Sequence, residues 1–147
     1  MNKVLVMLTW LSLIPGAWAA QNLQPTNPAR SYSAGMVTEG GRFVWLAGMG
    51  GTRSADGTKI DGIEAQTRQA FRNIEAALKR AGGGLEHLVS MTVMIRNQAD
   101  GDAFVRVRGE FFKGKFPASM LITAKDFANA DLLVEIQSVA VIGDTLN

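Results

Sequence analysis

The segment LLVEIQSVAVI, at residues 132–142, decides the fold class of this chain. Its residues favour a β-strand, in which successive side chains point to opposite faces of the sheet. One face carries Val134, Ile136, Ala140 and Ile142, and the other carries Glu135, Gln137, Val139 and Val141. Because both faces include apolar side chains, we expect this strand to be buried on both sides. Helices can cover one face, and a neighbouring subunit can cover the other.

The preceding segments predict the helices and strands that such a sheet requires. Apolar residues at helical spacing predict helices over residues 63–80 and 100–112. Residues 87–95 and 119–124 are rich in β-branched and other apolar residues, and they predict two further strands. Each predicted helix therefore precedes a predicted strand.

Two short β-prone segments lie nearer the start of the chain, at residues 32–37 and 43–47. Gly40-Gly41 separates them, and this pattern predicts a β-hairpin. The complete order is then β-β-α-β-α-β-β. It indicates an α+β fold, in which a mixed β-sheet carries both helices on one face.

The first nineteen residues have the pattern of a secretory signal peptide. Lys3 precedes an apolar run from Val4 to Ile14, and Ala17-Trp18-Ala19 has the small residues that signal peptidases recognise. We expect cleavage after Ala19 or Ala20. The mature protein is then periplasmic or secreted and has no membrane association. An uncleaved interfacial anchor is the alternative.

The mature chain divides into a short leader and one domain. Residues 20–30 are polar and include two prolines, so they are predicted to form an N-terminal leader. Residues 31–147 are predicted to form the single domain, which is long enough to bury a core.

The composition excludes several kinds of chemistry. The chain has no cysteine and one histidine, His87, so neither thiol catalysis nor a metal site is expected. Its 15 basic and 13 acidic residues are nearly balanced, and the basic ones are spread along the chain. Nucleic acid is therefore not an expected partner. His87 is expected at the surface or at a subunit interface.

Several short motifs follow one another at spacings that match a known family. They are Tyr32-Ser33, Gly48, Gln66-Thr67, Ala81-Gly82-Gly83, Phe111-Phe112, Pro117-Ala118 and Val134-Glu135-Ile136. In this order the chain resembles the RidA/YjgF family, the reactive-intermediate imine and enamine deaminases. The resemblance covers essentially the whole mature chain. It implies a chorismate-mutase-like fold and a homotrimer that binds a small-molecule ligand in a pocket at each subunit interface.

The resemblance also implies roles for individual residues in such a pocket. Glu135 matches a glutamate that holds or activates water, and we predict that it is the catalytic general base. A pocket-lining or interface carboxylate is the other interpretation. Tyr32 matches an aromatic residue that closes the pocket, and Gly48 belongs to the backbone that positions the ligand. No cofactor is required, because a protonated imine is already electrophilic.

Ser119 is the position at which this chain departs from the family. Deaminating members have an arginine there, which clamps the substrate carboxylate through paired, charge-assisted hydrogen bonds. A serine donates one neutral hydrogen bond, so standard 2-imino-acid deamination is not expected. Arg96, next to Asn97, and Arg108 are candidates for the missing cation. The alternative for each arginine is a solvated surface position. Arg96, Asn97 and Ser119 are the predicted substrate-binding residues on this side of the pocket.

Three classes of function remain open at this point. The first is hydrolysis of an imine, an enamine or a related C–N bond, with Glu135 as base. The second is a non-catalytic trimer that binds a metabolite. The third is a chaperone-like or structural role of the exposed surface.

Overall fold

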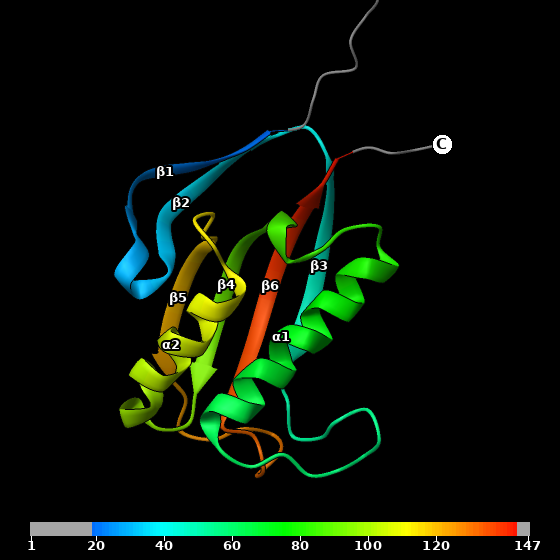
Figure 1. Cartoon of the computed structure of the whole chain (residues 1–147), viewed down its shortest axis with the longest axis vertical. Helices are drawn as coiled ribbons and strands as arrows, with labels where there is room; N and C mark the ends of the chain where they lie inside the picture. Colours follow the sequence, from blue (N-terminus) through cyan, green and yellow to red (C-terminus); the bar gives the residue numbers. More distant parts are fainter. Residues whose placement is uncertain (1–18, 144–147) are drawn as a thin grey trace, which may run out of the picture.

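The computed structural model describes residues 19–143, which form one six-stranded mixed sheet with both long helices on one face (Figure 1). The strands are β1 (Ala19–Asn27), β2 (Tyr32–Glu39), β3 (Arg42–Met49), β4 (Leu88–Ile95), β5 (Ala118–Thr123) and β6 (Val134–Ile142). Their order across the sheet is β1-β2-β5-β4-β6-β3. β5 runs parallel to β4 and to β2, and the other neighbouring strands are antiparallel. The predicted α+β fold is confirmed.

The last strand, β6, lies between β4 and the edge strand β3. Val134, Ile136 and Ala140 are fully buried beneath the helices. Glu135 and Gln137, which point to the opposite face, are only partly buried. A single chain therefore covers one face of β6 completely and leaves part of the other accessible. Cover by a neighbouring subunit stays a prediction.

Helix α1 (Ile63–Arg80) packs on the sheet through an apolar stripe. Ala70, Ile74 and Leu78 are fully buried and recur every four residues, so they lie on one face of the helix. The helix ends at Arg80, and Gly82, two residues later, has a φ of 84°, which favours glycine. The next N–H, that of Gly83, donates to the Leu78 carbonyl oxygen at 2.9 Å, which satisfies one of the last carbonyls.

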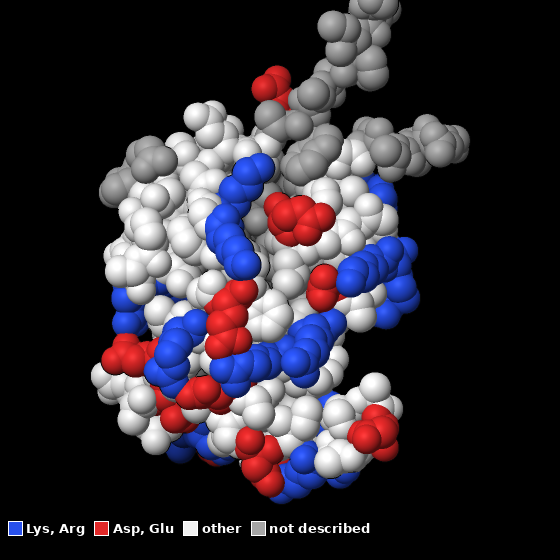
Figure 2. Space-filling model, in the orientation of Figure 1, with Lys and Arg blue, Asp and Glu red and all other residues white. Residues whose placement is uncertain are grey.

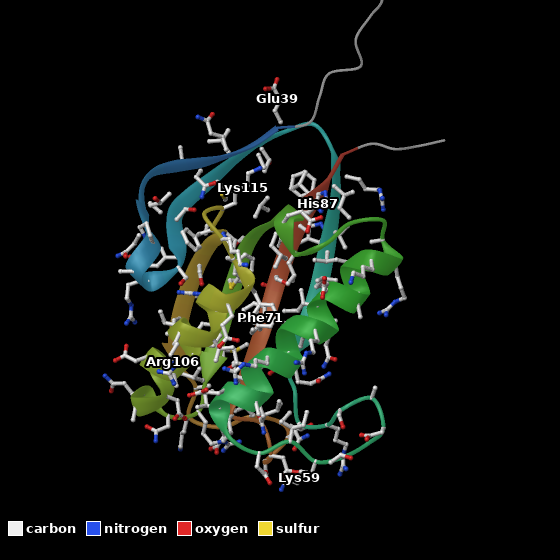
Figure 3. The ribbon with its side chains drawn as sticks, in the orientation of Figure 1. Glu39, Lys59, Phe71, His87, Arg106 and Lys115 are labelled. Atoms are coloured by element: carbon white, nitrogen blue, oxygen red, sulfur yellow. The ribbon has the colours of Figure 1, made fainter. Side chains whose placement is uncertain are left out.

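Helix α2 (Gly101–Phe111) packs beside α1 through a cluster of aromatic rings. Phe71, which is labelled in Figure 3, projects from α1 and is fully buried. Its ring centroid lies 4.8 Å from that of Phe111, 5.6 Å from that of Phe112 and 6.3 Å from that of Phe104. This cluster joins both helices to the core and holds α2 above β4 and β5.

The polar segment at residues 20–30 contributes to the sheet, which differs from the leader predicted from the sequence. It contains most of β1 and a short 3-10 helix (Pro28–Arg30). β1 pairs with β2 from Ala19 to Asn27, with an irregularity between Leu23 and Thr26. Strand pairing uses backbone N–H and C=O groups, so polar side chains do not prevent it. The sheet therefore begins before residue 31.

The hairpin predicted between β2 and β3 is wrong, although the turn occurs where the sequence places it. Gly40 and Gly41 have φ values of 68° and 80°, which favour glycine. The two strands then diverge (Figure 1): β2 pairs with β1 and β5, and β3 pairs with β6. The glycines specify only the local reversal. Val44 and Leu46 pack against the core and keep β3 beside β6.

The predicted signal peptide, residues 1–19, lies outside the described residues except for Ala19. Between residues 19 and 143, no helix is long and apolar enough to cross a membrane. Export, and cleavage after Ala19 or Ala20, stay predictions.

Acidic and basic side chains alternate over the helical face of the molecule (Figure 2). Arg68 of α1 binds Glu64 at 3.4 Å and Glu110 of α2 at 2.6 Å. Arg106 of α2 also contacts Glu64. These partly exposed pairs connect the two helices, but each contributes little to stability because water screens it.

We expect Phe71→Ala to lower the free energy of unfolding by about 3–5 kcal/mol, because it leaves a cavity among three aromatic rings. Urea denaturation followed by circular dichroism measures the change. Arg72→Ala, at the next and exposed position of α1, is the control and should change stability by less than about 0.5 kcal/mol. Equal effects of the two substitutions would contradict the central position of Phe71.

Candidate functional site

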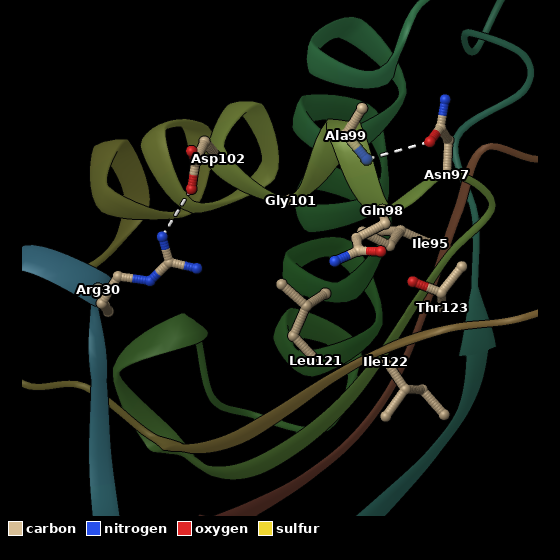
Figure 4. A pocket seen from close by; sticks show the side chains of 10 residues that line it. All are labelled: Arg30, Ile95, Asn97, Gln98, Ala99, Gly101, Asp102, Leu121, Ile122 and Thr123. Carbon is tan, nitrogen blue, oxygen red and sulfur yellow. Dashed lines mark hydrogen bonds and ion pairs between the residues drawn. The ribbon is translucent and has the colours of Figure 1, made fainter.

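A cavity of about 800 Å³ opens along β5, beside the start of α2 (Figure 4). Its lining consists of Arg30, Ile95, Asn97, Gln98, Ala99, Gly101, Asp102, Leu121, Ile122 and Thr123. At one side, Arg30 Nη1 donates to Asp102 Oδ1 at 2.6 Å. The cavity therefore combines an apolar floor from β5 with a polar rim from the segment that precedes α2.

Asn97 is the predicted site residue that lines this cavity. Its Oδ1 accepts a hydrogen bond from the Ala99 N–H at 3.0 Å and so caps the short 3-10 helix Gln98–Asp100. The amide N–H₂ group, bonded to the same Cγ atom, points away from Ala99 (Figure 4). Asn97 is exposed, so this amide is available to a ligand.

Arg96 binds backbone carbonyl groups of the loop before β6. Its Nε donates to the Leu132 carbonyl at 2.8 Å, and Nη2 donates to the Ala130 carbonyl at 3.2 Å. The guanidinium also lies 5.3 Å from the centre of the Phe127 ring. Arg96 thus holds the loop before β6 in place, which favours a structural role over the predicted role in substrate binding.

Arg108 and Ser119, by contrast, are joined directly. Arg108 Nη1 donates to Ser119 Oγ at 2.7 Å, and Nη2 donates to the Arg30 carbonyl oxygen. The Arg108 side chain also lies over the Phe104 ring, at 5.1 Å from its centre. The residue is 2% exposed, so it is not the solvated surface arginine that the sequence left open. Burial lowers the pKa of the Arg108 guanidinium to about 10, so it stays charged at neutral pH.

Tyr32 begins β2 close to this pair. Burial lowers the pKa of Arg108, and the charge of Arg30 lowers it further. Tyr32 has the opposite and smallest effect, since it raises this pKa. The next residue, Ser33, is buried, and its N–H donates to the Pro117 carbonyl at 3.1 Å. Asn22 Nδ2 donates to the Phe116 carbonyl at 2.8 Å. The first two strands are therefore attached to the chain immediately before Ser119.

Glu135 lies against Gly48 on the open face of the sheet. A Cβ atom at residue 48 would lie 2.8 Å from Glu135 Cδ, so the glutamate side chain occupies the space that a larger residue would need. The two predicted residues are therefore in contact. Glu135 is partly exposed, as a group that acts on a ligand must be.

The sheet register separates Glu135 from Ser119. Ser119 pairs with Met91, which is buried in the core under the helices. Glu135 pairs with Met94, three residues further along β4. Because side chains alternate along a strand, Met91 and Met94 point to opposite faces. Within one chain, the structure brings Ser119 together with Arg108, and Glu135 together with Gly48, but places these two groups on opposite faces of the sheet.

Sequence reasoning missed the pairing of Arg30 with Asp102. Arg30 belongs to the segment predicted as a leader, and Asp102 is an ordinary acidic residue in the first turn of a helix. Their contact depends on the place of the 3-10 helix Pro28–Arg30, which β1 and β2 carry to the start of α2. No local signal in the sequence reports it.

His87 lies in the 3-10 helix Leu85–His87, before β4, and is partly buried. Its Nδ1 accepts a hydrogen bond from the Gly84 N–H at 3.0 Å, which is a structural role. Across residues 19–143, no three His, Cys, Asp or Glu side chains lie together in a way that could hold a metal ion.

Comparison with known proteins gives a consistent set of relatives. A family model described as Endoribonuclease L-PSP matches residues 22–142. A RutC family protein of Pyrococcus horikoshii is 30% identical over 114 residues, which cover 77% of this chain and 88% of that protein.

Solved structures agree with this result. A Rid family protein of unknown function from Yersinia pestis superposes with a TM-score of 0.73 at 26% identity, over 85% of this chain and 98% of that one. RidA from an Antarctic Psychrobacter gives a TM-score of 0.65 at 27% identity, over 76% and 89% of the two chains.

We expect Gly48→Ala to displace the Glu135 carboxylate and to change stability by less than about 1 kcal/mol, because the end of a glutamate side chain can move. The carboxyl ¹³C resonance of Glu135 reports the displacement. Gly101→Ala is the matched control, since a Cβ there has no neighbour closer than 3.9 Å. An unchanged Glu135 resonance in Gly48→Ala would show that the two residues do not touch.

Proposed function

We propose that this chain, which belongs to the RidA/YjgF family described as Endoribonuclease L-PSP, is an exported homotrimer that binds a small molecule between subunits. The signal-like residues 1–19 support export. The family resemblance supports a trimer with pockets at the interfaces.

The main support for this proposal is that the predicted site residues lie in two groups on opposite faces of the sheet. Ser119 and Arg108 lie toward the helices, whereas Glu135 with Gly48 lies on the opposite face, which the cavity reaches only through Ile122. No rotamer change brings them together, because the sheet lies between them. A second chain that presents its Glu135 face to the β5 cavity completes the site.

Apolar side chains on the open face support the association. Phe43 and Trp45 of β3 are 51% and 72% exposed, and their rings stack at 6.1 Å. Met120 and Ile122 of β5 are 53% and 42% exposed on the same face. Large apolar side chains that gather on one face usually mark an interaction surface.

The chemistry that fits this arrangement is hydrolysis of an imine, an enamine or a related C–N bond. Glu135 takes a proton from water as the water oxygen attacks the electrophilic carbon. The proton then passes to the nitrogen, and the C–N bond breaks to give a carbonyl compound and an amine or ammonia. Orientation and a general base are sufficient, so the reaction needs no cofactor.

A non-catalytic, metabolite-binding trimer is the second candidate. It is favoured by Ser119, which stands where the family resemblance implies an arginine in deaminating members. Both candidates place the ligand in the same interface pocket, and the assay below separates them.

We expect the purified protein to sediment at three times the mass of one chain, and Trp45→Glu to sediment as a monomer. A charge buried in an apolar interface carries a large desolvation cost. Ala76→Glu, which places the same charge on the exposed side of α1, should leave the trimer intact. A wild-type monomer at micromolar concentration would rule out an interface site.

We expect imine hydrolysis by the wild type to fall by at least about a hundredfold in Glu135→Gln, because loss of a general base costs about 10²–10⁴. An amine oxidase generates imines that lack a carboxylate, an amino-acid oxidase generates 2-imino acids, and semicarbazide traps the imine that remains in each assay. Glu75→Gln, on α1, is the control. Turnover that survives in Glu135→Gln would remove its catalytic role, and absence of wild-type turnover on every substrate would favour the binding protein.

A further inference from the structure

A groove lies on the helical face of the molecule, at the end of α2 opposite to the β5 cavity. It consists of two adjoining cavities of about 470 and 270 Å³, and both are lined by Glu86 and Lys115. The larger one reaches Phe111, the last residue of α2, and we call the whole hollow the helix-end groove. It shares no lining residue with the β5 cavity, and neither Arg108 nor Ser119 lines it. The groove is therefore separate from the candidate site.

The floor of the helix-end groove is apolar. Leu85 and Phe112 line the larger cavity and are buried. Phe111 lines it too, and its ring centroid lies 4.8 Å from that of Phe71. Phe116, which is also buried, lines the smaller cavity. Small-molecule sites usually have such an apolar floor with a few polar groups at the rim, and their volumes are about 300–1,000 Å³. The larger cavity lies within this range.

Three acidic residues line the groove, and two of them already have counter-charges. Glu110 binds Arg68 at 2.6 Å, and Glu75 binds Lys79 at 3.1 Å. Because these two carboxylates are paired within the chain, they attract a cationic ligand only weakly. Glu86 is the third acidic residue.

Glu86 has no counter-charge in the part of the chain that the structure describes. Its Oε1 lies 3.2 Å from Nδ1 of His87. This nitrogen accepts a hydrogen bond from the Gly84 N–H at 3.0 Å, so it carries no hydrogen, and His87 does not neutralise Glu86. The Glu86 side chain is also exposed. Its carboxylate is therefore available to a positively charged group in the groove.

Asn22 supplies a second acceptor in the smaller cavity, which Glu86 also lines. Asn22 Nδ2 donates to the Phe116 carbonyl at 2.8 Å and to Ser33 Oγ, which uses both amide hydrogens. These bonds fix the orientation of the amide, and Oδ1 accepts no hydrogen bond from the described residues. A carboxylate and an amide oxygen in one cavity suit an ammonium group, which has three N–H donors and no acceptor.

Two lysines lie at the rim, in the segment between α2 and β5. Lys113 lines the larger cavity, and Lys115, which is labelled in Figure 3, lines both. Within residues 19–143, neither lysine forms an ion pair with a carboxylate. In the upper half of Figure 2, basic and acidic side chains lie on opposite sides of a hollow. The two ammonium groups are therefore available to an anionic group.

We propose that the helix-end groove binds a free α-amino acid with a large apolar side chain. The α-ammonium group binds Glu86 and Asn22 Oδ1, the α-carboxylate binds Lys115, and the side chain lies on the apolar floor of the larger cavity. A ligand with only one kind of charge would leave Glu86 or Lys115 without a partner. This inference goes beyond the proposed function and does not rest on it, because it requires neither assembly nor Glu135.

An apolar segment of a peptide chain is the competing occupant. It would cover the floor equally well. However, a residue inside a peptide has neither a free ammonium group for Glu86 nor a free carboxylate for Lys115. The dependence of binding on these two charges therefore distinguishes a free amino acid from a peptide.

L-Phenylalanine is the probe, because its ring fits an aromatic floor. Titration of the ¹⁵N-labelled protein, followed by amide chemical shifts, gives both the dissociation constant and the place of binding. Hydrocinnamate lacks the ammonium group of phenylalanine, and phenethylamine lacks the carboxylate. N-acetyl-L-phenylalanine amide represents a peptide segment.

We expect L-phenylalanine to bind with a dissociation constant of about 1 mM or less and to shift the amide resonances of residues 85–88 and 111–116. Glu86→Gln and Lys115→Gln should each weaken binding about fivefold, because each removes one partly exposed ion pair. Glu86→Gln should leave the binding of hydrocinnamate unchanged, and Lys115→Gln that of phenethylamine. Lys125→Gln, at an exposed position outside the groove, is the control and should change none of these constants.

The proposal is overturned if no resonance shifts at about 10 mM phenylalanine, ten times the expected dissociation constant, or if the shifts are confined to the β5 cavity. Binding that neither Glu86→Gln nor Lys115→Gln weakens would overturn it as well. Equal binding of N-acetyl-L-phenylalanine amide would assign the groove to a peptide instead. Both substituted residues are exposed, so the variants should fold, and circular dichroism checks this. The test uses neither hydrolysis nor sedimentation, so its result is independent of the proposed function.

Discussion

The buried guanidinium of Arg108 is the constraint on which the arrangement of the site depends. A cation removed from water needs hydrogen-bond acceptors, and the chain provides the Ser119 hydroxyl and the Arg30 carbonyl. These two groups come from segments far apart in the sequence. The hydrogen bonds of Arg108 therefore join α2 to β5 and to the 3-10 helix that precedes β2. The bonds from Ser33 and Asn22 to the Phe116–Pro117 backbone reinforce the same junction.

The alternation of side chains along β4 and β5 imposes the second constraint. It places Ser119 toward the helices and Glu135 toward the open face, whatever the rotamers of either residue. One chain therefore presents these two residues on opposite faces of the sheet. Apolar side chains on the same face of the sheet as Glu135, including Trp45 at 72% exposure, form the surface at which we propose that a second chain binds. In the function that we propose, assembly of the chains is therefore what completes the site.

Arg96 and Arg108, which the sequence presents as equal candidates for the missing cation, have different environments in the structure. The donors of Arg96 are occupied by the carbonyls of Leu132 and Ala130, so its charge serves the loop before β6. Arg108 uses two of its nitrogens and leaves Nε without a partner among the described residues. The difference arises from burial and from the carbonyl groups that surround each side chain, neither of which follows from residue type.

The sequence by itself determined the α+β class, both helices and the strands from β4 to β6, because these depend on local periodicity and on apolar composition. It also identified Glu135, Gly48 and Ser119 as candidates through motifs that resemble those of the family, and Asn97 through its place beside Arg96. Only the tertiary structure decided that β1 joins the sheet, that β2 and β3 separate, and that Arg108 supports Ser119. Backbone pairing and long-range burial select among partners that are locally equivalent, so no pattern within a short segment reports the choice.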